Sequence, residues 1–220
     1  NVGFFALTKG AMDGVIRPLA YGWEFIIPEP GRQSISNVSR NAAYPVRLVS
    51  LLLQGRLKDS GSETGHFLIN STLGVAGLFD PAGHFGVLTR SEDVGQAFGS
   101  WGVGSGFYLF IPLMGPSSGR DGVGKVFDTA LTPTSYVPGL SWFFAFNSLS
   151  LNLEPYDALV RSQRDLYGVT RAMWAVKRQV DVEDYTIPEV AFASAGADLS
   201  LGALTTRPTD ASFAAKARDR

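Results

Sequence analysis

The stretch FGSWGVGSGFYLFIPLMGPSSGRDGVGK, residues 98–125, is the part of the sequence that most constrains the fold. Glycine occupies every second position from residue 102 to residue 106, immediately before the apolar run FYLFIPLM. Glycine adopts backbone conformations that other residues avoid, and it lets neighbouring segments approach closely. We therefore expect these glycines to form sharp turns.

The end of this stretch, Gly119 to Lys125, has the GxxxxGK spacing of a phosphate-binding loop. Such a loop needs Ser or Thr at the next position, because the hydroxyl binds magnesium, but this sequence has Val126. The segment GVGSG also departs from the GxGxxG pattern of a dinucleotide site. We therefore predict that the chain does not bind nucleotides.

No other stretch carries a catalytic or metal-binding motif. The chain has no cysteine and no GxSxG nucleophile motif, and His66 and His84 lack the spacing of metal ligands. We predict that the protein is not an enzyme and holds no cofactor or metal. With a net charge of −1 and no Lys/Arg cluster, it also lacks the basic face that a nucleic-acid partner would require.

Apolar residues recur at helical spacing along most of the chain, so the predicted class is all-α. Predicted helices cover residues 12–27 with a bend at Pro18, 32–41, 45–53, 62–73 and 155–179. Gly55 should end the third of them. Two further helix starts are predicted at Asp80, which precedes a proline, and at Ser91, which two acidic residues follow.

The composition indicates an unusual amount of buried or lipid-facing surface. Only 18% of residues are charged, against about 25% in typical soluble domains, while 45% are apolar. No apolar run reaches the roughly 18 residues of a spanning helix. A chain of short amphipathic helices can instead lie in a membrane interface, and the alternative is an ordinary helical globule whose apolar faces all meet its own core.

Three segments carry a resemblance to a known family. IRPLAYGWEFIIPEPGRQSISNVSRNAAYPVRLVSLLLQG, HFLINSTLGVAGLFDPAG and VGQAFGSWGVGSGFYLFIPLMGPSSGRDGVGKVFD follow one another between Ile16 and Asp128. Together they resemble the MlaA (VacJ) family of outer-membrane lipoproteins. The segment from Pro155 is similar to the family's later DPY helix, with Glu154 in place of aspartate. Phe107 stands where the family usually has proline, and the early DP…GFNR motif and the lipid-anchoring cysteine are absent from the sequence.

The resemblance implies a monotopic ring of short amphipathic helices around an amphipathic channel, formed by residues 1–188. The segment 189–220 is rich in Ala, Ser, Asp and Arg, and this composition predicts a weakly packed C-terminal tail. It implies a phospholipid translocation channel that removes mislocalised phospholipid from the outer leaflet and so maintains lipid asymmetry. The implied location is the periplasmic leaflet of the Gram-negative outer membrane, with a lipid anchor upstream of residue 1. Implied partners are phospholipid, trimeric porins and the periplasmic carrier MlaC; the alternative is a periplasmic protein-interaction module without lipid transport.

Two groups of site residues follow from this reading. The apolar run should form a hairpin or ridge beside the channel and gate lipid entry; it comprises Phe107, Tyr108, Leu109, Phe110, Ile111, Pro112, Leu113 and Met114. A second group should fasten loops around the pore; it comprises Asn70, Asp80, Gly99, Gly102, Gly104, Gly106, Arg120 and Asp121. The pair Arg120–Asp121, beside Asp128, could bind an anion or a headgroup, but an ion pair that holds a loop is the commoner role.

Overall fold

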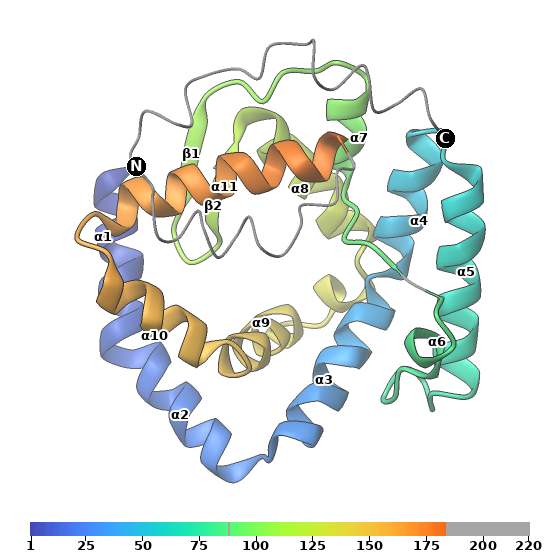
Figure 1. Ribbon diagram of the computed structural model, residues 1–220, viewed down its shortest axis with the longest axis horizontal. Coiled ribbons are helices and arrows are strands. Elements are labelled where there is room, and N and C mark those ends of the chain that lie inside the picture. Colours follow the sequence, from blue (N-terminus) through green and yellow to red (C-terminus); the bar gives the residue numbers. More distant parts are fainter. Residues whose placement is uncertain (88, 184–220) are drawn as a thin grey trace. The chain divides into compact units, whose positions relative to one another are not determined.

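A computed structural model describes residues 1–87 and 89–183, and this part of the chain is mostly helical with one small two-stranded sheet (Figure 1). The predicted all-α class is therefore confirmed, and the sheet is the hairpin expected from the apolar run. The boundary predicted at residue 188 and the predicted tail at 189–220 lie outside the described residues. No helix in the described part is both long enough and apolar enough to cross a membrane.

The first helical segment begins earlier than predicted. Helix α1 (Val2–Ala11) continues through a π-helical turn, η1 (Met12–Ile16), into α2 (Arg17–Ile26). The irregular turn lies just before Pro18, which occupies the first turn of α2. Proline has no N–H to donate and is tolerated at this position, so the helix shifts its register before the proline and does not kink within α2.

The next helices follow the sequence pattern closely. Helix α4 (Tyr44–Leu53) matches the prediction, and Gly55 has the left-handed φ of +74° expected after a helix end. Helix α3 (Glu29–Ala42) starts three residues before the predicted Arg32, because Pro30 fits in the first turn of a helix. Helix α5 (Leu57–Thr72) starts five residues before Ser62, so that predicted start was wrong. Asp80 caps the short helix α6 (Pro81–His84) as predicted, because its carboxylate accepts the Gly83 N–H.

Helix α7 (Val94–Ser100) starts at a different cap from the one predicted. Asp93, and not Ser91, is the N-cap, since its side chain accepts the Gln96 N–H. Strands β1 (Tyr108–Ile111) and β2 (Gly115–Ser118) then pair antiparallel, with Tyr108 opposite Ser118. The fold continues with α8 (Gly119–Leu131), a 3₁₀ turn η2 (Pro133–Tyr136) and α9 (Leu140–Ser150).

The single long helix predicted at 155–179 is two helices, α10 (Leu153–Ser162) and α11 (Leu166–Glu183). The chain leaves the helix at Gln163 and starts again after Asp165, whose carboxylate accepts the Gly168 N–H at 2.9 Å. An aspartate in this position satisfies a backbone donor that a new helix start leaves free, so it restarts the helix. Asp157 of α10 accepts hydrogen bonds from Arg17 and Tyr21 and thereby joins α10 to α2.

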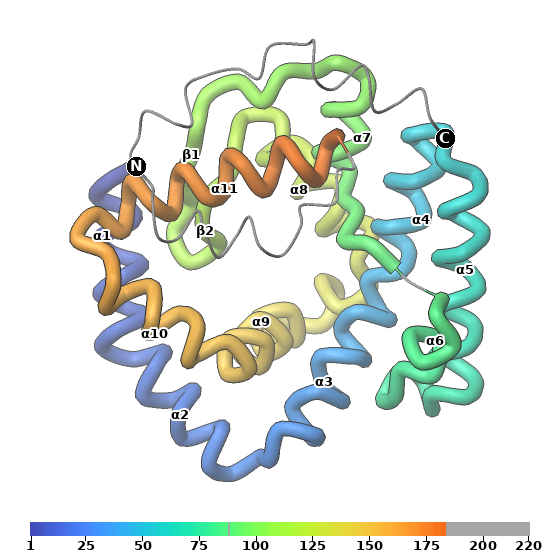
Figure 2. The backbone as a smooth tube through the Cα atoms, viewed as in Figure 1, coloured from blue at the N-terminus to red at the C-terminus, as the bar shows by residue number. Residues whose placement is uncertain are grey.

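Within the described residues the helices and strands contact one another in a closed circuit (Figure 2). Helix α1 contacts β1, β2 contacts α8, α8 packs on α7, and α7 packs on α4. The circuit then passes through α3 and α9 to α2, which continues back to α1. The chain thus returns to its first helix through contacts between elements that are distant in sequence.

The interior of this unit is unusually polar. Among the described residues eight apolar side chains are buried, whereas sixteen polar or charged ones are. Many large apolar side chains are exposed instead, including Phe25 at the end of α2, which is 92% exposed. Such a distribution is the reverse of that in ordinary soluble domains.

Candidate functional site

The predicted gating run, Phe107 to Met114, forms most of the hairpin and is held between α1 and α11. Phe110 is buried, and its ring packs edge-on against the Phe5 ring of α1, with 5.3 Å between the ring centroids. The Tyr108 ring packs against the Trp174 ring of α11, with 5.4 Å between the ring centroids. The Arg171 guanidinium carbon lies over the Tyr108 ring, 5.2 Å from its centroid. The remaining apolar residues of the hairpin are half-buried or exposed, with Phe107, Leu113 and Met114 the most exposed.

The glycines before the hairpin have different roles. Gly102 and Gly106 have φ values of +86° and +70°, which side-chain-bearing residues rarely adopt, so they make the predicted turns. Gly99 lies in α7, where a Cβ would meet Val182 at 2.7 Å, so it permits close packing with α11. Gly104 shows neither a positive φ nor a close neighbour, and nothing in its surroundings requires glycine.

The segment that resembles a phosphate loop forms the first two turns of α8. Ser118 caps this helix by accepting the Asp121 N–H, so the backbone donors of Gly119 to Lys125 belong to a helix and do not line a loop. A Cβ on Gly124 would lie 2.5 Å from the Gly95 backbone nitrogen. The glycine spacing therefore serves the contact between α8 and α7.

Arg178 of α11 is the centre of an ion cluster that the sequence analysis missed. Its guanidinium donates to both carboxylate oxygens of Asp93 at 2.6 and 2.7 Å and to both of Asp121 at 2.8 Å. Arg120 adds a hydrogen bond to Asp121 at 3.0 Å and donates to the Val103 carbonyl at 3.2 Å, so the predicted Arg120–Asp121 pair is an ion pair within α8 that also holds the preceding loop. Burial raises the pKa of Asp93 and Asp121, but the bonds from Arg178 outweigh it and hold both pKa values below the ordinary one.

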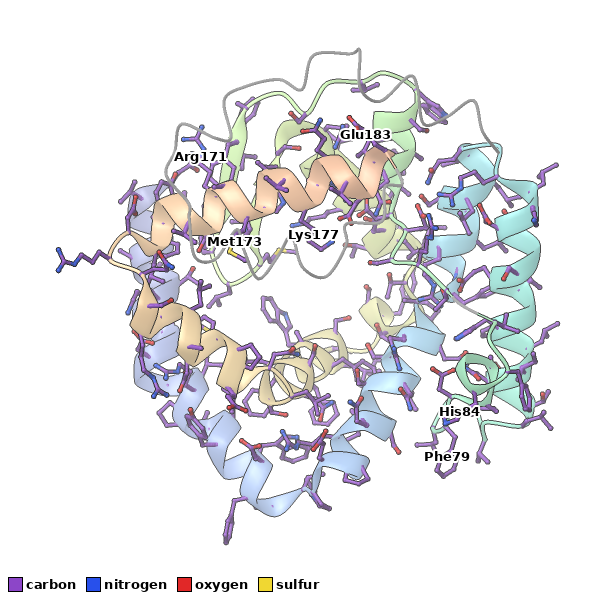
Figure 3. All side chains as sticks on the ribbon, viewed as in Figure 1. Phe79, His84, Arg171, Met173, Lys177 and Glu183 are labelled. Carbon is purple, nitrogen blue, oxygen red and sulfur yellow. The ribbon has the colours of Figure 1, made fainter. Side chains whose placement is uncertain are left out.

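Beside this cluster lies a polar cavity of about 220 Å³ between α7, β2, α8 and α11. Its lining includes Ser117, Lys125, Asp128 and Lys177. Burial lowers the pKa of the Lys125 ammonium and raises that of the Asp128 carboxyl to about 6. Figure 3 shows the side chains of Met173 and Lys177 extending from α11 toward the interior of the circuit.

A second cavity, of about 230 Å³, is mainly apolar and lies between α1, the hairpin, α10 and α11. Its apolar lining comprises Phe5, Met12, Phe110, Leu113, Met114, Pro116, Tyr156, Leu159, Val160 and Leu166. Thr170 of α11 also lines it. Pro116 of β2 lines both cavities, so the two adjoin along the hairpin.

Asn70 and Asp80 lie together on another part of the unit. The Asn70 amide donates to Asp80 at 2.9 Å and accepts the Ala82 N–H at 3.0 Å, while Asp80 also accepts the Gly83 N–H. His66 lies 3.3 Å from the same carboxylate. These contacts fix the loop between α5 and α6.

The sequence carried a signal for some of the missed residues and none for others. Asp93 precedes an apolar helical pattern, which identifies it as a possible cap. Arg178 is 57 residues from Asp121 and 85 from Asp93, and no local pattern indicates either pairing. Within the described residues no group of His, Cys, Asp and Glu side chains has the arrangement of a metal site.

Comparisons with known proteins agree with the resemblance in the sequence. A family model described as MlaA lipoprotein matches residues 1–181. The chain is 32% identical over 176 residues to an uncharacterized protein of Rickettsia felis, covering 77% of this chain and 70% of that one. It is 30% identical to the intermembrane phospholipid transport system lipoprotein MlaA of Shigella flexneri, covering 71% of this chain and 65% of that one.

One solved structure is also similar. It was reported as the structural basis for maintenance of bacterial outer membrane lipid asymmetry. Its chain superposes with a TM-score of 0.73 at 26% identity, and the match covers 83% of this chain and 96% of that chain. The similarity therefore extends over nearly the whole of the solved chain.

Proposed function

The chain belongs to the MlaA lipoprotein family, and on this basis we propose that it takes part in phospholipid transport at the outer membrane of a Gram-negative bacterium. It lies in the periplasmic leaflet and takes mislocalised phospholipid out of the outer leaflet through an amphipathic channel. Its partners are trimeric porins and the periplasmic carrier MlaC, to which the lipid passes. The channel does no chemistry on the lipid.

The observation that carries this proposal is the reversed distribution of polar and apolar side chains. A phospholipid headgroup cannot cross hydrocarbon without polar partners, because an unsatisfied polar group there costs several kcal/mol. The buried polar side chains of this unit mostly form hydrogen bonds within the protein, as Arg47 does with Glu63, and polar side chains that line a cavity, such as Lys125 and Lys177, offer such partners. The exposed apolar side chains of α1 and α2, with Phe25 the most exposed of the described residues, fit contact with acyl chains.

The hairpin is the part of the fold best suited to control access. It carries exposed apolar side chains at Phe107, Leu113 and Met114, and its two strands are only four residues each. We assign the run Phe107 to Met114 to gating of lipid entry. Asn70, Asp80, Arg120, Asp121, Gly99, Gly102 and Gly106 hold the surrounding loops in place, whereas the role proposed for Gly104 rests on the resemblance alone.

Purification separates this function from that of a protein-interaction module without lipid transport. The full chain, expressed in a Gram-negative host, should partition with the outer membrane, require detergent for extraction and carry phospholipid detectable by mass spectrometry after washing. A protein-interaction module would be extracted without detergent and would carry no lipid. Recovery of lipid-free protein from the aqueous fraction would contradict the proposal.

A further inference from the structure

The two adjoining cavities share one face of α11. Leu166, Thr170, Trp174, Lys177 and Asp181 follow one another at intervals of four, four, three and four residues, which places them along one side of a helix. Leu166 and Thr170 line the apolar cavity, whereas the other three line the polar one. The face is therefore apolar at its N-terminal half and charged at its C-terminal half.

The polar cavity contains groups whose bonding capacity is not used. The Lys125 ammonium makes no hydrogen bond or close ion pair with any other described residue, although this side chain is half-buried. The Ser117 hydroxyl is fully buried, in a residue only 1% exposed, and has no hydrogen-bond partner in the described part of the chain. The Lys125 charge interacts with those of Asp93, Asp121 and Asp128, but neither this ammonium nor the buried Ser117 hydroxyl has a hydrogen-bond acceptor among the described residues, so both can donate to an anionic group.

The same cavity also offers negative charge. Asp128 accepts the Val94 N–H with one carboxylate oxygen at 3.0 Å, and its other oxygen has no partner among the described residues. Asp93 and Asp121 are both occupied by Arg178, and Asp181 pairs with Lys177. The unused groups are thus one ammonium, one hydroxyl and one carboxylate oxygen, which match a headgroup that carries both charges.

We propose that the two cavities form one binding site for a zwitterionic phospholipid of the phosphoethanolamine type. The phosphodiester binds Lys125 and Ser117, the ammonium binds Asp128 beside Trp174, and part of one acyl chain enters the apolar cavity past Pro116. This inference rests on the proposed transport function and adds the class of lipid and the residues that hold it. Charged groups prefer charged or hydrogen-bonding partners, and an acyl chain prefers the apolar walls.

Two variants test the two halves of the site separately. Lys125→Met removes the partner of the phosphodiester, and the exposed Lys58→Met is its control. Thr170→Trp fills the apolar cavity, and the exposed Thr72→Trp is its control. The full chain is purified in detergent, stripped of lipid, and titrated with dioleoyl phosphatidylethanolamine, glycerophosphoethanolamine or inorganic phosphate, with native mass spectrometry as the readout.

Lys125→Met should weaken phosphatidylethanolamine binding about tenfold relative to Lys58→Met, the loss expected for one charged hydrogen bond. Thr170→Trp should weaken binding of the lipid at least as much but leave glycerophosphoethanolamine binding unchanged. Equal binding by Lys125→Met and its control would overturn the site. Inorganic phosphate binding as tightly as the lipid would also overturn it, because the free Lys125 ammonium would then belong to a simple anion site and not to a lipid site.

The outcomes distinguish this inference from the proposed function. A wild-type protein that binds no phospholipid contradicts the transport function itself, whereas wild-type binding that neither variant changes contradicts only this site. If Lys125→Met does not fold, the site is tested by crosslinking a photoactivatable phosphatidylethanolamine to the wild-type chain. Crosslinks should then fall on peptides from α8, the hairpin and α11, and crosslinks confined to other helices would reject the site.

Discussion

The Asp128 side chain is partly buried in the polar cavity, and this burial disfavours its charged form. Burial raises its pKa from the ordinary 3.8 to about 6, although the hydrogen bond from the Val94 N–H works in the opposite direction. The folded protein therefore binds this proton more tightly than the unfolded chain does. The contribution of the protonated carboxyl to stability is present below pH 3.8 and is lost as the pH rises to about 6.

Replacing Asp128 by Asn should remove the loss of folding stability that occurs when Asp128 ionises. The amide oxygen can still accept the Val94 N–H, while the charge is gone. We expect the thermal midpoint of Asp128→Asn to exceed that of wild type by more at pH 7 than at pH 4. Circular dichroism melts of both proteins in one detergent, at pH 4, 5, 6 and 7, measure this difference, and a difference independent of pH would refute the assignment.

The titration of other carboxyl groups does not obscure this comparison. Asp93 and Asp121 have lowered pKa values, so their contributions are lost only as the pH falls below the ordinary value near 3.8. Both groups are present in wild type and in Asp128→Asn. Their effect therefore largely cancels in the difference between the two melting curves.

At the scale of elements, the contact between α7 and α8 depends on two glycines. Gly95 and Gly124 face one another so closely that a Cβ on Gly124 would lie 2.5 Å from the Gly95 nitrogen and 2.8 Å from its Cα. These neighbours are backbone atoms and cannot turn away. The two helices would have to separate to admit even one methyl group.

Gly124→Ala should therefore destabilise the fold by about 1–3 kcal/mol, the usual cost of overpacking. Gly122 on the same helix has open space where its Cβ would be, so it provides the matched control. Gly122→Ala should be neutral or stabilise by up to about 1 kcal/mol, because alanine favours a helix over glycine. Denaturant unfolding measures the free energy of unfolding of both variants. Equal changes in the two variants would contradict the close contact between α7 and α8.

Sequence patterns predicted the elements that local signals control. Helix α4 was found because Pro45 lies in its first turn and Gly55 follows its end, and the glycine-rich stretch correctly indicated turns at Gly102 and Gly106. The start of α3 was placed too late because Pro30 and Gly31 lie inside its first turn. The break between α10 and α11 was missed because the apolar periodicity continues across it. Local periodicity does not show whether a helix restarts at an internal cap.

The candidate site was less predictable than the helices. The hairpin and the Arg120–Asp121 pair follow from neighbouring residues, and both were anticipated. Arg178 reaches its partners only because α11 packs beside α7 and α8, and this long-range contact leaves no local signal. The two cavities likewise arise where β2, α8, α10 and α11 meet, so their residues are scattered along the chain.

At the scale of the whole described unit, buried polarity and exposed apolar surface belong together. A protein in water would lose stability by burying charged groups and exposing large apolar side chains. In a membrane interface the exposed apolar side chains would contact acyl chains, while the buried polar side chains form hydrogen bonds between the helices. Membrane association should therefore weaken when the most exposed apolar side chains are replaced by charged ones.

Phe25 and Ile26, at the end of α2, provide the clearest test because they are 92% and 69% exposed. The double variant Phe25→Lys, Ile26→Lys should weaken binding to phosphatidylcholine vesicles by roughly 1.5–3 kcal/mol per side chain, the transfer free energy lost. Its thermal midpoint should change little, since neither side chain contributes to the interior.

The control is Gln33→Lys on α3, which adds a positive charge at an exposed polar position. Vesicle flotation of the purified proteins, after detergent removal, gives the bound fraction of each. The control should float like wild type, because it removes no apolar surface. If the double variant also floats like wild type, the end of α2 does not enter the bilayer, and the apolar surface that faces lipid must lie on other helices.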